Sequence, residues 1–127
     1  MTAHPESQRR SEFAARAAAD KKGADTVILD VSDIISVAET FIITSGANPR
    51  QVRTIAEEIE AQLKAHCDTA PAQVEGLSDA SWVLLDYGDI VVHVFLAQTR
   101  AYYDLDRLWS DAPHLPWSAS GEAAATL

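Results

Sequence analysis

The chain has 127 residues, of which 47% are hydrophobic, which is enough for one domain with a buried core. Its single cysteine excludes an internal disulfide, and no apolar run reaches the roughly 18–20 residues that span a membrane. With 19 acidic and 10 basic residues, the formal net charge of −9 disfavours direct binding to nucleic acid or anionic lipid. No apolar segment follows Arg9 and Arg10, so no secretion signal is indicated and we expect a cytoplasmic protein.

The first part of the chain predicts a helix followed by two strands. Residues 1–8 are polar, and we expect them to be flexible. From about Arg9 to Lys22, alanines and Phe13 form the narrow apolar stripe of an amphipathic helix, which Gly23 ends. Strands are predicted at residues 26–31 and 40–44, with a turn near residues 32–33 between them.

A second helix has a well-marked start. Asn48 is suited to be the N-cap, Pro49 takes the first helical position and Gln51 the third, as in a capping box. Apolar residues then recur at helical spacing, which predicts that the helix packs on the sheet and ends near residues 66–67: Val52, Ile55, Ile59 and Leu63.

Two features near this helix start have alternative interpretations. Ser45 and Gly46 resemble a rudimentary phosphate site, but one glycine without a lysine favours a tight strand-to-helix turn. Arg50 and Arg53 place positive charge where the helix dipole opposes it. That placement suits either a structural ion pair or contact with a partner.

Residues 82–95 predict an antiparallel hairpin whose two faces differ, after a short strand at about residues 71–74. One face is purely aliphatic and is expected in the core: Val83, Leu85, Ile90, Val92, Val94 and Leu96. The other face combines acids and a histidine with apolar side chains: Trp82, Leu84, Asp86, Asp89, Val91, His93 and Phe95. That mixture suits neither a core nor an ordinary solvated surface.

The acids at the hairpin tip favour contact with a basic partner. With Tyr87 and Gly88 as a two-residue loop, Asp86 lies opposite Asp89, and like charges in that position cost up to about 1 kcal/mol. The alternatives are that the carboxylates bind loop amides, or that a shifted register moves Asp89 into the turn and leaves the face otherwise unchanged. Residues 75–111 contain seven acids and two bases, so we expect a basic protein surface as the partner.

A final helix is predicted at residues 98–109. Its stripe of Tyr102, Leu105 and Trp109 is expected in the core, with Tyr103 to one side at an interface. The tail at residues 113–127 is expected to be flexible, so the domain spans residues 9–112. The order of elements predicts an α/β (α+β) fold with a mixed β-sheet flanked by helices.

The candidate catalytic groups do not assemble into a site. Asp104 and Asp106 point about 200° apart on a helix, so they are not expected to share a metal ion. His93 has no second histidine or cysteine at metal-ligand spacing, and a hydrogen-bonded structural role is favoured for it. We therefore predict no enzyme, no cofactor and no metal site.

These motifs resemble those of the Iojap family of ribosomal silencing factors (RsfS). The resemblance is carried by WVLLDYGDIVVHVF at residues 82–95, RAYYDLD at 100–106 and LW at 108–109. Shorter segments match in the same order: DV at 30–31, FIITSG at 41–46, RQ at 50–51 and EG at 75–76. The similarity spans about residues 25–113, most of the chain.

The resemblance implies a small α/β protein with a nucleotidyltransferase-like fold that lacks the catalytic carboxylates. It implies a cytoplasmic homodimer that docks on ribosomal protein fourteen of the large ribosomal subunit, at the intersubunit face. Occupying that face would block association with the small subunit and repress translation when nutrients are limited.

The docking residues of the family carry over to Trp82, Asp86 and Tyr87, and we expect Asp89 and His93 on or beside the same surface. Little or no direct nucleic-acid binding and no membrane contact are expected. The alternative is a divergent nucleotidyltransferase-like enzyme that binds a nucleotide near residues 45–50.

Overall fold

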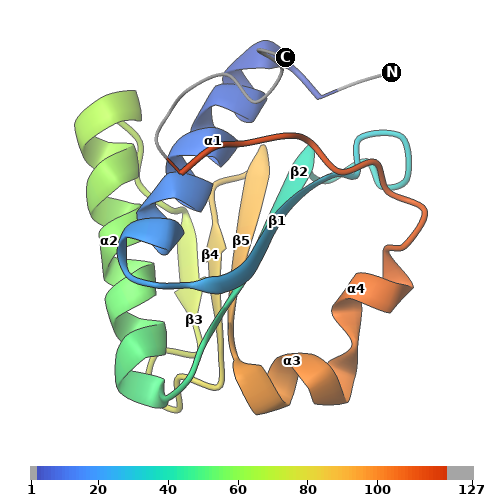
Figure 1. Cartoon of the computed structure of the whole chain (residues 1–127). Helices are drawn as coiled ribbons and strands as arrows, with labels where there is room; N and C mark the ends of the chain where they lie inside the picture. The colour runs from blue at the N-terminus through green and yellow to red at the C-terminus, as the bar shows by residue number, and fades with distance from the viewer. Residues whose placement is uncertain (1–2, 120–127) are drawn as a thin grey trace.

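The computed structural model describes residues 3–119, which form a five-stranded sheet with helices on both faces (Figure 1). The elements in chain order are α1 (Pro5–Asp20), β1 (Ala24–Asp30), β2 (Thr40–Gly46), α2 (Pro49–Cys67), β3 (Gln73–Glu75), β4 (Trp82–Asp86), β5 (Ile90–Leu96), α3 (Ala97–Tyr103) and α4 (Leu105–Leu108). Within the described residues, no helix has the length and apolar character needed to cross a membrane.

The sheet is mixed, as the sequence predicted. Its strand order is β1-β2-β5-β4-β3, with β2 and β5 parallel and every other neighbouring pair antiparallel. A parallel pair requires a long crossover connection, and α2 lies within the connection from β2 to β5. Helices α1 and α2 lie side by side on one face of the sheet, while α3 and α4 lie toward the other (Figure 1).

The hairpin of β4 and β5 has the predicted faces but a different register. Asp86 pairs with Val91, and the amide of Tyr87 donates to the carbonyl of Ile90, so Gly88 and Asp89 form the turn. The register predicted with Asp86 opposite Asp89 is therefore wrong by two residues, and the shifted alternative is correct. Because a shift of two residues leaves each side chain on its face, the aliphatic side still packs against α1 and α2.

Helix α1 begins earlier than predicted. His4 is its N-cap, with Nδ1 accepting from the amide of Glu6, and Pro5 takes the first turn. Ser7 is buried, as is Ala3, whose amide donates to the Asp30 carboxylate at 3.0 Å. Residues 5–8, which were expected to be flexible, therefore form the first part of α1.

The predicted start of α2 is confirmed. The Asn48 side chain accepts from the amide of Gln51 at 2.8 Å, and Gln51 Oε1 accepts from the amide of Ala47. Gln51 Nε2 donates to the carbonyls of Lys21 and Lys22, which ties the start of α2 to the end of α1. The helix ends at Cys67, where the sequence placed its end.

The C-terminal part differs from prediction in two respects. The predicted helix breaks at Asp104, whose φ of 51° lies in the left-handed region, so Tyr102 is 83% exposed rather than in the core. Beyond α4 the chain runs along β1, with a bridge from His114 to Leu29 and a hydrogen bond from Trp117 Nε1 to the carbonyl of Thr26.

This segment extends the folded part past residue 112, whereas residues 120–127 of the predicted tail lie outside the described range.

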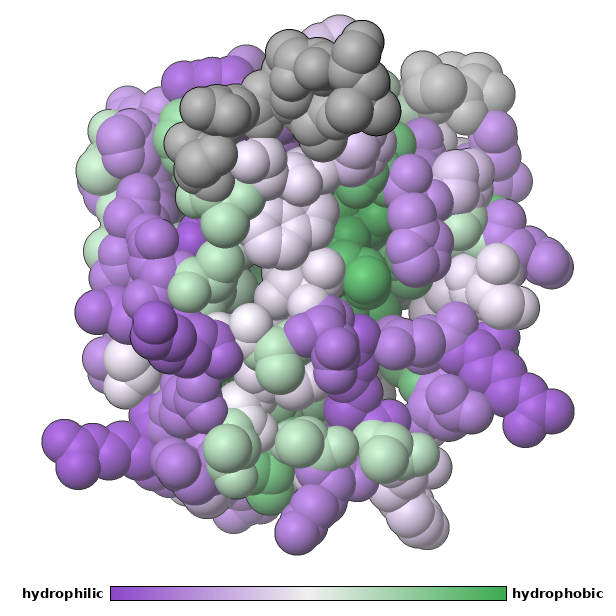
Figure 2. All heavy atoms as spheres, viewed as in Figure 1, coloured by the Kyte–Doolittle hydropathy of each residue, from purple (hydrophilic) through white to green (hydrophobic). Residues whose placement is uncertain are grey.

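On the side shown in Figure 1, hydrophobic residues occupy the middle of the face and hydrophilic ones lie on both sides of them (Figure 2).

Candidate functional site

An aromatic cluster lies on the face of the sheet opposite α1 and α2. We call it the Trp82 cluster; its members are Phe41, Trp82, His93, Phe95 and Tyr103. The ring centroid of Trp82 lies 4.8 Å from that of Phe95 and 5.1 Å from that of Tyr103. Trp109 closes the cluster on the other side, with its ring edge-to-face with Phe41 at 5.2 Å.

The sheet register assembles this cluster from four elements. Trp82 of β4 is paired with Phe95 of β5, and His93 is paired with Leu84, so alternating residues of the two strands share one face. The parallel pairing of β2 with β5 places Phe41 beside Val91 on that face. Helix α3 follows β5 directly, and its last residue, Tyr103, lies against Trp82.

His93 is the buried centre of the cluster. It is 6% exposed, and its Nδ1 accepts a hydrogen bond of 3.1 Å from Nε1 of Trp82. Burial lowers the pKa of His93 from 6.5 to about 4, because the surrounding apolar rings stabilise the neutral form. His93 is therefore neutral at physiological pH, and the predicted hydrogen-bonded structural role agrees with its position.

The surface beside Trp82 exposes an unusual amount of aromatic area. Tyr102 is 83% and Tyr103 55% exposed, and both line a hollow with Trp82, Ser81, Gln98 and Thr99. A second hollow, on the β3 side, is lined by Glu75, Gly76, Trp82 and Leu84. Exposed aromatic and apolar area of this kind is typical of a surface that binds another macromolecule.

The structure divides the five predicted site residues between two faces. Trp82, Asp86 and His93 share the face of the Trp82 cluster, as expected from their spacing. Tyr87 instead packs against the α1 and α2 core, where its hydroxyl is buried without a hydrogen-bond partner among residues 3–119. Burial, with further contributions from Glu60 and Cys67, raises the Tyr87 pKa well above its usual value.

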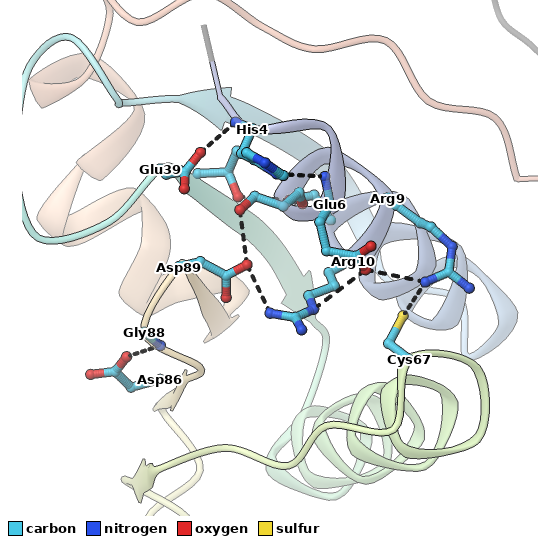
Figure 3. A network of polar contacts seen from close by, with 12 residues as sticks. His4, Glu6, Arg9, Arg10, Glu39, Cys67, Asp86, Gly88 and Asp89 are labelled. Carbon is cyan, nitrogen blue, oxygen red and sulfur yellow. Dashed lines mark hydrogen bonds and ion pairs between the residues drawn. The ribbon is translucent and has the colours of Figure 1, made fainter.

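Asp89 is turned toward α1 (Figure 3). Its Oδ2 accepts from the Ser7 hydroxyl at 2.8 Å and forms an ion pair with Arg10 at 3.0 Å. Asp86 Oδ1 accepts from the amide of Gly88 at 2.8 Å, which is the loop-amide arrangement considered as an alternative. The two acids of the hairpin tip therefore do not form one cluster.

Sequence reasoning assigned no structural role to Arg100, which is almost fully buried at 9% exposure. Its guanidinium donates to Ser45 Oγ at 2.8 Å and pairs with Asp106 at 2.9 Å. The spacing of the predicted helix gave no signal for this burial, because Arg100 lies on the side opposite the stripe of Tyr102, Leu105 and Trp109. The Ser45 hydroxyl therefore has a hydrogen-bond partner within the protein, which favours its interpretation as part of a structural turn.

Two further candidates near the start of α2, Gly46 and Arg53, also have structural roles. Gly46 lets α2 approach β2, since a Cβ there would lie 3.0 Å from the amide nitrogen of Val52. Arg53 donates to the carbonyls of Leu77 and Ser78, so it holds the loop before β4. In the part of the chain that the structure describes, no three His, Cys, Asp or Glu residues are grouped to hold a metal ion.

The fold and this surface define a small α+β protein with an exposed aromatic face. A family model described as "Ribosomal silencing factor during starvation" (RsfS) matches residues 4–126. The ribosomal silencing factor RsfS of Bacillus subtilis is 43% identical over 102 residues, covering 80% of this chain and 86% of that protein. The RsfS of Chromobacterium violaceum is 38% identical over 122 residues, covering 90% and 98% respectively.

A crystal structure of a protein from Chromobacterium violaceum has the same fold, with a TM-score of 0.78 and 36% identity. The match covers 93% of this chain and 95% of that one. The chain therefore belongs to the RsfS family of ribosomal silencing factors, as its motifs indicated.

Proposed function

We propose that this protein silences ribosomes by binding the large subunit through the face that carries the Trp82 cluster. The partner is ribosomal protein fourteen at the intersubunit face, and the bound protein blocks association with the small subunit. Translation is thereby repressed under nutrient limitation. We also propose that the protein acts in the cytoplasm as a homodimer. The exposed aromatic surface of Trp82, Tyr102 and Tyr103 supports this assignment most strongly.

Charge supports a basic protein as the partner. The chain has a net charge of −9, and Asp86 lies on the same face as Trp82, with Glu75 lining the adjacent hollow. Such a surface repels exposed ribosomal RNA and attracts a basic ribosomal protein. Large aromatic anchors bordered by acids are also the residue types that dominate the affinity of small protein interfaces.

Steric exclusion fits the chemistry of the site. The cluster presents ring surfaces, and the indole N–H of Trp82 is bound by the imidazole of His93 within the fold. Blocking subunit joining requires only bulk at the correct position. The contact of Tyr87 and Asp89 with the partner stays a prediction, and their inward orientation supports a role in stability instead.

The proposal is tested by measuring binding of the labelled protein to purified large and small subunits separately, and to isolated ribosomal protein fourteen. We expect saturable binding to the large subunit and to ribosomal protein fourteen, weakening as salt is raised. Tyr102→Ala should weaken binding at least fivefold, because Tyr102 is exposed beside Trp82.

Val37→Ala is the control for an exposed apolar side chain outside the proposed site. Val37 is 80% exposed, and the hollow that it lines does not include Trp82 or Tyr102. Binding to the small subunit alone, or equal loss of affinity in both variants, would contradict the proposal.

A further inference from the structure

The only polar group of the Trp82 side chain is bonded inward. The indole Nε1 is a donor only, and its hydrogen bond ends on His93 Nδ1 at 3.1 Å. The two residues come from neighbouring strands, and His93 is 6% exposed whereas Trp82 is half-buried. The pyrrole edge of the indole is thus held against the buried imidazole.

This hydrogen bond determines which ring nitrogen of His93 carries the proton. An Nδ1 that accepts a hydrogen bond from the indole N–H carries no proton of its own, so the single proton of neutral His93 lies on Nε2. Nε2 is buried without a hydrogen-bond partner among residues 3–119. The rings of Phe41 and Phe95 lie 4.9 and 6.2 Å from the imidazole, an environment that suits the neutral form.

Packing alone leaves the indole some freedom. Trp82 contacts Phe95 on one side and the half-exposed Tyr103 on another, and neither contact fixes which edge of the indole faces outward. The hydrogen bond to His93 does so, because reversing the ring would leave the Nδ1 acceptor of His93 unpaired at a buried site.

From this geometry we propose that His93 is a positioning residue for docking. It holds the Trp82 indole in one orientation, with the Nε1 edge inward, and it does not itself contact the partner. Trp82 therefore offers only carbon surface, and its binding pocket on the ribosomal partner is apolar and needs no acceptor for Nε1. This inference rests on the proposed function, in which Trp82 is a docking anchor.

Two substitutions of His93 test the inference. His93→Asn places a carbonyl oxygen near the position of Nδ1 and keeps an acceptor for Trp82. His93→Leu keeps similar bulk and removes the acceptor. The readouts are the indole N–H resonance of Trp82 by NMR, assigned with Trp82→Phe among the three tryptophans, and affinity for purified large subunits.

We expect His93→Asn to retain a hydrogen-bonded indole resonance and to bind within about threefold of wild type. His93→Leu should shift that resonance and lose about five- to tenfold in affinity. In the Trp82→Phe background, His93→Leu should cause no further loss, because the donor is already absent. If His93→Leu does not fold, His93→Gln replaces it, since its carbonyl oxygen lies nearer the position of Nε2.

Three results would overturn the inference. Wild-type affinity in His93→Leu despite a shifted resonance would show that orientation of the indole is not needed. Weak binding by His93→Asn with a native resonance would show that the imidazole itself contacts the partner. If the wild type binds no large subunits, the proposed function fails, and the docking role of His93 fails with it.

Discussion

Gly76 lies directly against the carbonyl oxygen of Trp82. A Cβ at Gly76 would stand 2.0 Å from that oxygen, and the Gly76 φ of +87° is one that other residues rarely adopt. The loop before β4 can follow its path only because this residue has no side chain. Gly76 thereby fixes the backbone position from which the Trp82 indole projects.

Gly76→Ala should destabilise the protein by about 3 kcal/mol or more, because it adds both backbone strain and a collision with backbone. Gly88→Ala is a matched control: Gly88 has a φ of +90°, but a Cβ there meets nothing within 4 Å. Strain alone should cost about 1 kcal/mol at Gly88. Urea unfolding of both variants measures the difference, and equal losses would show that the contact with Trp82 has no energetic consequence.

Substitutions of Asp89 and Asp86 should have different effects. The first should lower stability, and the second should weaken binding. Asp89→Ala removes the acceptor of the Ser7 hydroxyl and the ion-pair partner of Arg10, so unfolding free energy should fall by about 1–3 kcal/mol. Affinity of the folded protein for large subunits should stay within about twofold.

Asp86→Asn keeps the acceptor for the Gly88 amide and removes a charge near Trp82, so it should weaken binding and lessen its salt dependence with little change in stability. Calorimetric unfolding and binding titrations at two salt concentrations check the pair. A well-folded Asp89→Ala that fails to bind would place Asp89 in the partner contact.

The buried His93 should make stability depend on pH. Its pKa is about 4 in the folded protein and 6.5 when unperturbed, so between these values the unfolded chain binds more protons. The stabilising contribution of neutral His93 is complete above about pH 6.5 and is lost as pH falls toward 4. From pH 7.5 to pH 5 this loss should be about 2 kcal/mol.

The His93→Asn variant isolates this titration from that of other groups. Urea unfolding of wild type and variant at pH 7.5 and pH 5 should show the larger decline in the wild type. An equal decline in both proteins would contradict a neutral, buried His93.

Patterns that repeat along one element could be predicted from the sequence. The aliphatic face of the hairpin alternates strictly, and the start of α2 carries Asn48 and Pro49 at cap positions, so local rules were sufficient. The hairpin register was not fixed by the pattern, because a shift of two residues keeps every side chain on the same face.

Features that depend on distant partners could not be predicted. The first turn of α1 looks polar and loose, yet Ser7 is buried by its bond to Asp89, 82 residues away. The break at Asp104 follows from a left-handed residue, which apolar spacing does not reveal. The five predicted site residues were expected on one surface. In the structure, Tyr87 and Asp89 contact the helices instead.

The most direct test of the account is the rate at which purified small and large subunits associate, followed by light scattering, with the protein in slight excess. We expect wild-type protein, preincubated with large subunits, to suppress association strongly. Trp82→Ala, verified as folded by circular dichroism, should suppress it at least tenfold less effectively, because it removes the central anchor of the Trp82 cluster. Unchanged association with wild-type protein, or equal suppression by Trp82→Ala, would contradict the account.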